Sequence, residues 1–191
     1  NAKVVIIAAG VGAFGPKRPP LADIEMYEAA GPGRGVKYMV AKTSDFAGKR
    51  VVIAGGGDSA VDWANVLSGV AESVSVVHRR DKFRAMPDSV RKMETLIEDD
   101  RIHLVTPYQL ERLEGSNGNL EAVIVADLDG NERALEADVL LPFYGLSQDL
   151  GPIRSWGLND SRAGIPIDPA TAMTPRAGIY AVGDIADCPG K

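Results

Sequence analysis

The chain has 191 residues, 45% of them hydrophobic, and a formal net charge of −5, which is the composition of an ordinary globular protein. The mild acidity gives no general attraction for nucleic acid or an anionic membrane, and no apolar run reaches the roughly 18 residues that a membrane helix needs. A single cysteine, Cys188, excludes an internal disulfide, and with two histidines as the other soft ligands a metal site is not expected.

The chain begins at Asn1 without a methionine or the layout of a signal peptide. We therefore expect a cytoplasmic protein, and a piece of a longer polypeptide. Residues 3–8 form a continuous β-branched run, which predicts a strand buried on both faces. The following stretch, 11–35, is rich in glycine and proline, and we interpret its end, 31–35, as a junction between domains.

The middle of the chain alternates buried strands with helical patterns, which is typical of β-α-β units and a parallel sheet. Each strand is a short apolar run, and each helix repeats apolar residues at helical spacing. The expected strands are 50–54, 74–77 and 102–105, and the expected helices are 58–69 and 89–98, the second capped by Asp88 or Ser89.

After Pro107 the pattern changes to alternating strands with turn signals at 116–118 and 129–130, which predicts a three-stranded antiparallel meander. A buried strand returns at 139–143, and a second junction begins at Tyr144-Gly145. The last expected strand is 178–182. The two ends of the chain must then pair with each other or with further polypeptide.

A glycine-rich turn follows the strand 50–54. The residues Gly55-Gly56-Gly57-Asp58-Ser59-Ala60 match G-x-G-x-x-[GA] directly after a buried strand and at the start of a helix, the context that supports a dinucleotide site. The first glycine makes the turn, the second lets the backbone approach a pyrophosphate, and the small alanine lets the helix pack closely. The alternative is a plain strand-to-helix turn that needs glycine for its shape.

An arginine cluster lies at the end of the next strand. An NAD site has Asp or Glu about 20 residues beyond the glycines, whereas this chain has His78-Arg79-Arg80, with Arg84 shortly after. Forked guanidinium donors suit a 2′-phosphate, so the pattern favours NADPH over NADH. The alternative is a solvated basic turn. His78 either contacts the phosphate or fills the strand end, and we interpret His103 as structural.

Four segments together resemble the thioredoxin-reductase-like flavoproteins of the pyridine nucleotide-disulfide oxidoreductase superfamily. They are GRGVKYMVAK (33–42), VVIAGGGDSAVDWA (51–64), VSVVHRRDKFRA (74–85) and GIYAVGDIAD (178–187). In that family an NADPH domain interrupts an FAD domain. The resemblance implies an α/β fold: a Rossmann-like NADPH-binding domain over 36–144, with an antiparallel β-meander, inserted between pieces of an incomplete FAD-binding domain, 1–35 and 145–191.

One departure narrows the resemblance. Thioredoxin reductases carry a Cys-x-x-Cys dithiol where this chain has Met39-Val40-Ala41-Lys42, and without two thiols no dithiol relay can operate. The chain resembles instead the ferredoxin–NADP⁺ reductases on the same scaffold, also through LGPIRSWGL (150–158). This implies hydride transfer between NADP(H) and FAD, ferredoxin or flavodoxin as electron partner, and a homodimer.

The resemblance also assigns roles outside the glycine turn. Asp184 would hydrogen-bond the FAD ribityl chain while Gly183 allows close approach, and Gly10 would lie near the core of the flavin domain. A strand-ending turn with an Asx cap is the alternative for Gly183-Asp184. Tyr144-Gly145 would line the nicotinamide side at a hinge that also uses Gly33 and Gly35. Because the family's FAD-phosphate glycine motif is not in this sequence, we expect firm NADPH binding and weak or absent FAD binding.

The sequence nominates no general acid, base or nucleophile, because the cofactors carry this chemistry. Rival interpretations are another NADPH-dependent flavin reductase that receives its dithiol from elsewhere, and a non-catalytic NADPH-binding module. An NAD-dependent alcohol-type dehydrogenase is poorly supported, since no zinc-ligand set is present and arginines stand where an NAD site has Asp or Glu. The expected cofactor-binding residues are Gly55, Gly56, Gly57, Asp58, Ser59, His78, Arg79, Arg80, Arg84, Tyr144, Gly145, Gly183 and Asp184.

Overall fold

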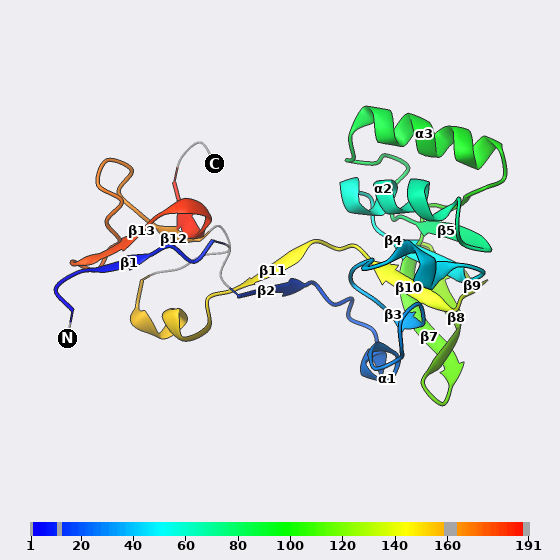
Figure 1. Ribbon diagram of the computed structural model, residues 1–191, viewed down its shortest axis with the longest axis horizontal. Helices are drawn as coiled ribbons and strands as arrows, with labels where there is room; N and C mark the ends of the chain where they lie inside the picture. Colours follow the sequence, from blue (N-terminus) through cyan, green and yellow to red (C-terminus); the bar gives the residue numbers. More distant parts are fainter. Residues whose placement is uncertain (1, 11–12, 159–163, 189–191) are drawn as a thin grey trace. The chain divides into compact units, whose positions relative to one another are not determined.

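The computed structural model describes residues 2–10, 13–158 and 164–188 of the chain (Figure 1). The chain separates into two units, one formed by Asn1–Pro16 with Gly145–Lys191 and the other by Lys17–Tyr144. Each unit is described here by itself. In the described part of the chain, every helix is too short or too polar to cross a bilayer.

The larger unit is built on a five-stranded parallel sheet with the order β3-β10-β4-β5-β6. The helices α2 (Asp58–Leu67) and α3 (Pro87–Glu98) connect β4 to β5 and β5 to β6, which confirms the predicted β-α-β arrangement. The strands are β3 (Gly35–Val36), β4 (Arg50–Ala54), β5 (Ser73–Val77), β6 (His103–Val105) and β10 (Val139–Pro142).

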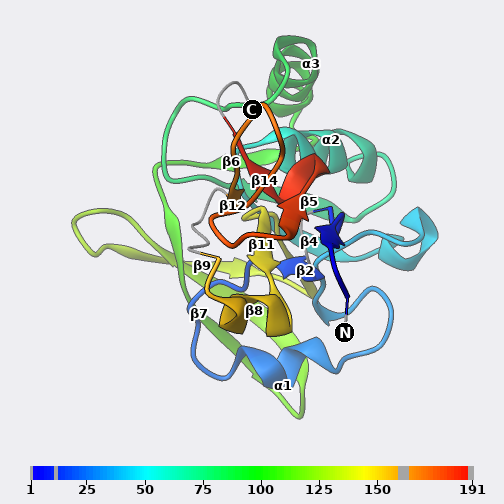
Figure 2. The ribbon, with the colours of Figure 1, turned by 90° about the vertical axis from the view of Figure 1, so that its left-hand side faces the viewer.

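Alternate residues of the parallel strands enter two separate cores. Val51 and Ile53 of β4 pack with α2, α3 and the short 3₁₀ helix η1 (Thr43–Phe46), while Val52 and Ala54 pack on the opposite face. Both faces are therefore covered, which explains why the strands read as continuous apolar runs. Figures 1 and 2 agree in placing α2 and α3 together on one side of the sheet.

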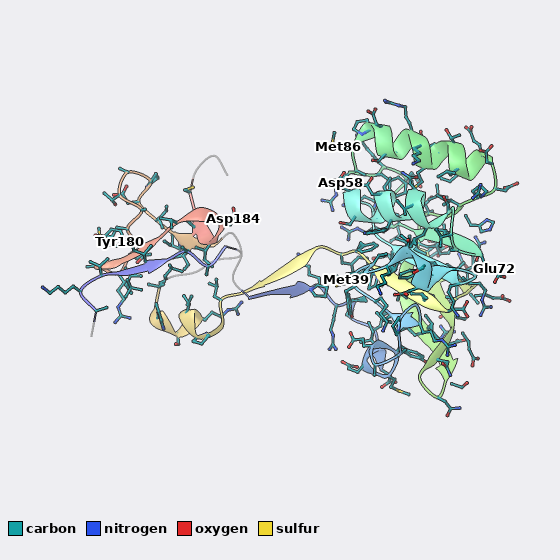
Figure 3. The ribbon with its side chains drawn as sticks, viewed as in Figure 1. Met39, Asp58, Glu72, Met86, Tyr180 and Asp184 are labelled. Atoms are coloured by element: carbon teal, nitrogen blue, oxygen red, sulfur yellow. The ribbon has the colours of Figure 1, made fainter. Side chains whose placement is uncertain are left out.

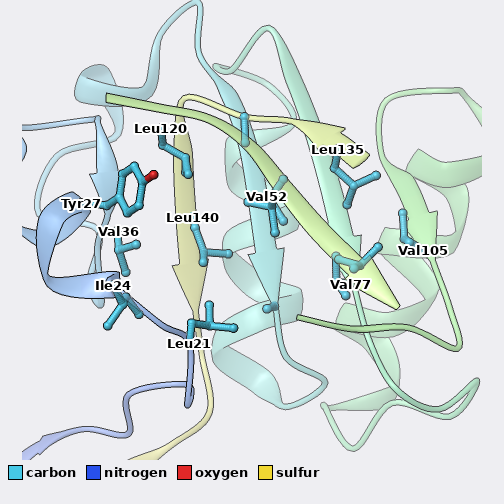
Figure 4. Packing of buried hydrophobic residues seen from close by; sticks show 14 residues of the cluster. Leu21, Ile24, Tyr27, Val36, Val52, Val77, Val105, Leu120, Leu135 and Leu140 are labelled. Atoms are coloured by element: carbon cyan, nitrogen blue, oxygen red, sulfur yellow. The ribbon is translucent and has the colours of Figure 1, made fainter. Parts of the chain in front are cut away.

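The opposite face is covered by an antiparallel meander and a short helix. The meander consists of β7 (Gln109–Ser116), β8 (Asn119–Ala126) and β9 (Glu132–Glu136), paired in that order. The predicted meander is therefore confirmed. Figure 4 shows side chains of this core, among them Leu120 of β8 and Leu140 of β10, which are at most 4% exposed.

An ion pair fixes the amino end of β4. The Arg50 amide donates to Asp138 Oδ2 at 2.9 Å, and the Arg50 guanidinium donates to Asp138 Oδ1 at 2.9 Å and to Glu136 Oε2 at 2.8 Å. The Arg50 hydrogen bond holds the pKa of the Asp138 carboxyl below its usual value. These contacts tie the start of β4 to the segment that leads into β10.

Two expectations about local structure are corrected. Helix α3 begins with Pro87 and is preceded by Met86, whose side chain makes no capping bond. The expected cap at Asp88 or Ser89 is therefore wrong, because the fixed φ of proline suits the first helical position. Residues 17–35 belong with the larger unit, since α1 (Ile24–Glu28) buries Ile24 and Tyr27 in its core.

The glycines expected at the first hinge are packed tightly. A Cβ built on Gly35 would lie 2.1 Å from the Tyr27 carbonyl oxygen, and one on Gly33 would lie 1.8 Å from the Asp45 carbonyl oxygen. Both glycines also have positive φ angles, 62° for Gly33 and 66° for Gly35. Both glycines therefore let backbone segments approach closely, which gives them a packing role that the sequence did not indicate.

The smaller unit joins the two ends of the chain. Strand β1 (Val5–Ile7) pairs in parallel with β13 (Ile179–Ala181), which confirms that the ends pair with each other. The expectation that β1 is buried on both faces is wrong, because Ile7 is 4% exposed but Ile6 is 65% exposed. The other elements are β2 (Ala13–Pro16), β11 (Leu146–Asp149), β12 (Ile165–Pro166), β14 (Ala186–Asp187), η2 (Gly151–Trp156) and η3 (Gly183–Ile185).

The close approach at Gly35 can be tested with a matched pair of variants. Gly35 and Gly48 have φ angles of 66° and 64°, but only Gly35 has a neighbour within 4 Å of an added Cβ. Gly48→Ala should lower the free energy of unfolding by about 1–2 kcal/mol for the left-handed conformation alone. Gly35→Ala should lower it by a further ~1–3 kcal/mol through the steric clash. Urea unfolding measures both, and equal losses would contradict the packing role.

Candidate functional site

The carboxyl edge of the parallel sheet brings three predicted segments together. The glycine turn follows β4, His78 follows β5, and Tyr144 lies two residues after β10. Backbone bonds hold these ends together: the Gly55 amide donates to the Val77 carbonyl at 3.0 Å, and the Phe143 amide donates to the Ala54 carbonyl at 2.8 Å. This is the edge at which open parallel sheets bind ligands.

The first glycine makes a tight turn. A Cβ on Gly55 would lie 2.7 Å from the Phe143 carbonyl oxygen and 3.1 Å from the Ala60 Cβ. The second contact also explains Ala60, because a larger side chain there would push α2 away from β4. The predicted roles of these two residues in turn and packing are therefore confirmed.

The next two glycines differ in what surrounds them. A Cβ on Gly56 would lie 2.3 Å from the His78 imidazole, so this glycine makes room for the histidine ring. A Cβ on Gly57 would meet nothing within 4 Å. Gly57 precedes α2 and has no side chain to cap it, so the turn leaves open the space at the helix start that a phosphate would need.

The arginine-bearing segment folds back on the glycine turn. The Arg84 amide donates to the Gly56 carbonyl at 2.7 Å, and the Met86 amide donates to Asp58 Oδ1 at 2.8 Å. The rings of His78 and Phe83 lie 5.1 Å apart between centroids and are tilted by 30°. Backbone bonds and ring packing thus hold residues 79–86, which we call the arginine loop, against the turn.

The three guanidinium groups of the arginine loop are available for a ligand. Arg79, Arg80 and Arg84 are exposed. Within the described residues none of them forms an ion pair with a carboxylate, whereas Arg18, Arg50, Arg91 and Arg112 all do. The loop therefore presents three unneutralised forked donors next to the open helix start.

His78 lies between the turn and the loop. Burial lowers the pKa of its imidazole, and the positive charges of Arg79, Arg84 and Arg80 lower that pKa further, while a hydrogen bond with the Lys82 backbone acts in the opposite direction. Its backbone amide donates to the Val105 carbonyl at 3.1 Å. The ring therefore packs at the strand end beside Gly56 and Phe83, in surroundings that disfavour its protonated form.

Tyr144 and Asp58 take more defined places than the sequence indicated. Tyr144 follows β10, on the same edge of the sheet as the arginine loop, and is 39% exposed. Partial burial raises the pKa of its phenol, and the positive charge of Arg79 opposes that rise. Gly145 is exposed, with a φ of 85° and open space beside it. Asp58, which the sequence places in the glycine turn, also accepts a hydrogen bond from the Met86 amide. The sequence does not indicate this bond, because the two residues are 28 positions apart. Ser59 is exposed beside it.

The remaining predicted residues lie in the smaller unit. Gly183 begins η3 with a φ of 81° and has open space around the Cβ position, and Asp184 is exposed in the same turn. Gly10 is also open, with a φ of 59°. An exposed glycine turn of this kind is compatible with an extended polar ligand.

The other residues that the sequence analysis considered do not form a binding site in the described part of the chain. Met39 is 69% exposed, and Lys42 is exposed where a dithiol would need its second thiol. His103, which the sequence suggested to be structural, is exposed at the rim of a polar pocket of about 180 Å³ at the amino ends of β5 and β6. Cys188 is a free, half-buried thiol. Across the described ranges, no group of His, Cys, Asp and Glu could hold a metal ion.

Comparison with known sequences gives a consistent set of relatives. A family model described as pyridine nucleotide-disulphide oxidoreductase matches residues 1–191. A ferredoxin–NADP reductase of Rhodospirillum rubrum is 60% identical over 191 residues, which cover 100% of this chain and 54% of the relative. One of Rickettsia rickettsii is 53% identical over 191 residues, covering 100% of this chain and 55% of the relative. The chain spans a little over half the length of these curated relatives.

Comparison with solved structures gives the same fold. Thioredoxin reductase of Lactococcus lactis, in a form titled FR conformation, matches with a TM-score of 0.78 and 26% identity over 97% of this chain and 58% of its own. A bacillithiol disulfide reductase of Staphylococcus aureus matches with a TM-score of 0.78, covering 98% of this chain and 55% of its own. At 19% identity, the second match bears on the fold alone.

The packing of His78 predicts how its imidazole titrates. Its pKa should lie below the ordinary value of 6.5. Because that pKa is higher in the unfolded chain, the neutral ring contributes stability above about pH 6.5 that is lost as the pH falls through the folded pKa. NMR titration of the imidazole signals, assigned with His78→Gln, measures the midpoint. A midpoint at or above 6.5 would contradict burial of the neutral ring.

Proposed function

The chain belongs to the pyridine nucleotide-disulphide oxidoreductase family, and from that premise we propose that its larger unit, residues 17–144, binds NADP(H). The observation that carries the proposal is the arginine loop held against an open glycine turn. Three exposed guanidinium groups stand beside a helix start that has no capping side chain. The two features together match the two anionic ends of an adenosine 2′-phosphate diphosphate.

The glycine turn is assigned the pyrophosphate. Gly57 leaves open space at the start of α2, and the first backbone amides of a helix carry partial positive charge. Gly55 and Gly56 support this position indirectly, because they allow the turn and the packing of His78. Ser59 adds an exposed hydroxyl next to the same amides.

The arginine loop is assigned the 2′-phosphate. Arg79, Arg80 and Arg84 offer forked donors that match phosphate oxygens, and a phosphomonoester carries a charge between −1.5 and −2 near neutral pH. NAD(H) lacks this group and would leave the donors unused. The site should therefore discriminate in favour of NADP(H), with Tyr144 and Gly145 next to the nicotinamide.

The whole protein is assigned ferredoxin–NADP⁺ reductase activity. Identity of 60% to a relative of that name supports it, and the absence of cysteine from residues 39–42 argues against a thioredoxin reductase. FAD, for which Gly183 and Asp184 are the candidates in this chain, would exchange hydride with NADP(H) and single electrons with ferredoxin or flavodoxin. A homodimer in the cytoplasm is also part of this proposal, with the nucleotide-binding unit beginning near residue 17 and not at residue 36 as the sequence suggested.

Calorimetric titration with NADP⁺ and NAD⁺ in parallel tests the nucleotide assignment. NADP⁺ should bind more tightly than NAD⁺. Arg79→Ala and Arg80→Ala should each reduce this preference by about tenfold, the equivalent of one charged hydrogen bond, and should leave NAD⁺ affinity nearly unchanged. The effect should shrink as salt is raised, because exposed charges are screened.

Arg91→Ala is the matched control for this experiment. Arg91 is an exposed arginine on α3 that pairs with Asp88, outside the arginine loop. It should retain the wild-type preference. Equal affinity of the wild-type chain for both nucleotides, or equal losses in all three variants, would contradict the assignment of the 2′-phosphate.

Electron-acceptor assays on the whole protein test the reductase assignment. With NADPH as donor, reduction of a ferredoxin should proceed, as followed by cytochrome c reduction coupled to it. Reduction of a small dithiol protein should be at background, because residues 39–42 supply no thiol for the relay. Turnover of the dithiol protein without that of ferredoxin would favour the rival reductase that receives its dithiol from elsewhere.

A further inference from the structure

The Asp58 carboxylate joins the starts of two helices. Asp58 is the first residue of α2, and its Oδ1 accepts a hydrogen bond of 2.8 Å from the amide of Met86, the residue before α3. Figure 3 shows Asp58 and Met86 at neighbouring ends of these helices. The bond closes the carboxyl end of the arginine loop, while the loop begins at the end of β5.

The charge of Asp58 is unfavourable for an anionic ligand. Asp58 lies next to Gly57, at the helix start to which the pyrophosphate is assigned. A carboxylate beside a bound pyrophosphate would repel it. The Asp58 side chain is exposed, so packing in the core does not explain this residue either. The carboxylate is better explained by what it holds than by what it would bind.

Two hydrogen bonds attach the arginine loop to the glycine turn and the start of α2. One is the Arg84 amide on the Gly56 carbonyl at 2.7 Å, which depends on no side chain. The other is the Met86 amide on Asp58. Only the bond between Met86 and Asp58 can be removed by substituting the donor residue or the acceptor residue. Its donor, Met86, lies two residues after Arg84.

We propose that Asp58 is a positioning residue for recognition of the 2′-phosphate: by holding the Met86 amide it fixes the arginine loop in the conformation that binds NADP(H). This inference rests on the proposed function. A loop ordered before binding loses less conformational entropy on binding, and the gain applies only to nucleotides that contact the loop. Asp58 therefore increases the preference for NADP(H) over NAD(H) without touching the phosphate.

Variants at both ends of the bond separate this role from a charge effect. Asp58→Ala removes the acceptor and the charge, whereas Asp58→Asn removes the charge and keeps an oxygen acceptor. Met86→Pro removes the donor and keeps the charge, and the φ of Met86, −56°, is one that proline adopts. Asp62→Ala, an exposed acid one turn along α2, is the control for a change in net charge.

The NADP⁺ to NAD⁺ affinity ratio, measured by calorimetry, is the readout. Asp58→Ala and Met86→Pro should each lower the ratio by about tenfold, as for one hydrogen bond to a charged group. The double variant should lose no more than either one alone. Asp58→Asn and Asp62→Ala should retain the wild-type ratio. Hydrogen exchange of the Met86 amide should be faster in Asp58→Ala than in Asp58→Asn.

Each failure has a distinct meaning. Equal wild-type affinity for the two nucleotides overturns the proposed function. A wild-type preference that persists in Asp58→Ala or in Met86→Pro overturns only the role of Asp58. Equal loss of NADP⁺ and NAD⁺ affinity in both variants overturns it as well, since it would mean a general disturbance of the turn. If Asp58→Ala does not fold, Met86→Pro decides alone.

Discussion

The hydrogen bond from the Arg84 amide to the Gly56 carbonyl is the contact on which the candidate site depends. It places a basic segment from the end of β5 against the turn that ends β4, at 2.7 Å between donor and acceptor. The parallel pairing of β4 with β5 brings the two ends to the same edge. Without this hydrogen bond, the arginines would lie in an ordinary solvated turn. The glycine turn would then have no basic segment beside it to bind the second anionic group of a nucleotide.

The three glycines of the turn show how one motif serves three physical needs. Gly55 avoids the Phe143 carbonyl and Ala60, Gly56 makes room for the His78 ring, and Gly57 leaves open space at the start of α2. Only the last is assigned to a phosphate. The same arrangement lowers the pKa of His78, because burial of the ring and then the arginines that would attract a phosphate both disfavour a charged imidazole.

Much of the larger unit could be predicted because its signals are local. The strand 50–54, the helix that begins at Asp58 and the meander after Pro107 each follow from short sequence patterns, and the structure confirms them. The spacing of the arginines after the glycine turn predicts the pairing of these two segments without any family resemblance. Motifs that are contained within a short stretch of sequence can be identified without a structure.

What could not be predicted depends on contacts between distant residues. The packing of Gly35 on Tyr27 and the burial of Ile24 place residues 17–35 in the larger unit, although glycine and proline there suggested a linker. The bond between Asp58 and Met86 spans 28 positions, and no pattern marks it. The exposure of Ile6 depends on what packs against β1, which its apolar sequence cannot specify.

The ³¹P NMR spectrum of NADP⁺ bound to the chain tests the central claim most directly, because it observes the 2′-phosphate itself. In contact with Arg79, Arg80 and Arg84, this phosphate should titrate with a pKa below the value of about 6 that is usual for a phosphomonoester. Its resonance should therefore hold the position of the dianion to lower pH than in free NADP⁺. A bound 2′-phosphate that titrates as it does free in solution would contradict the account.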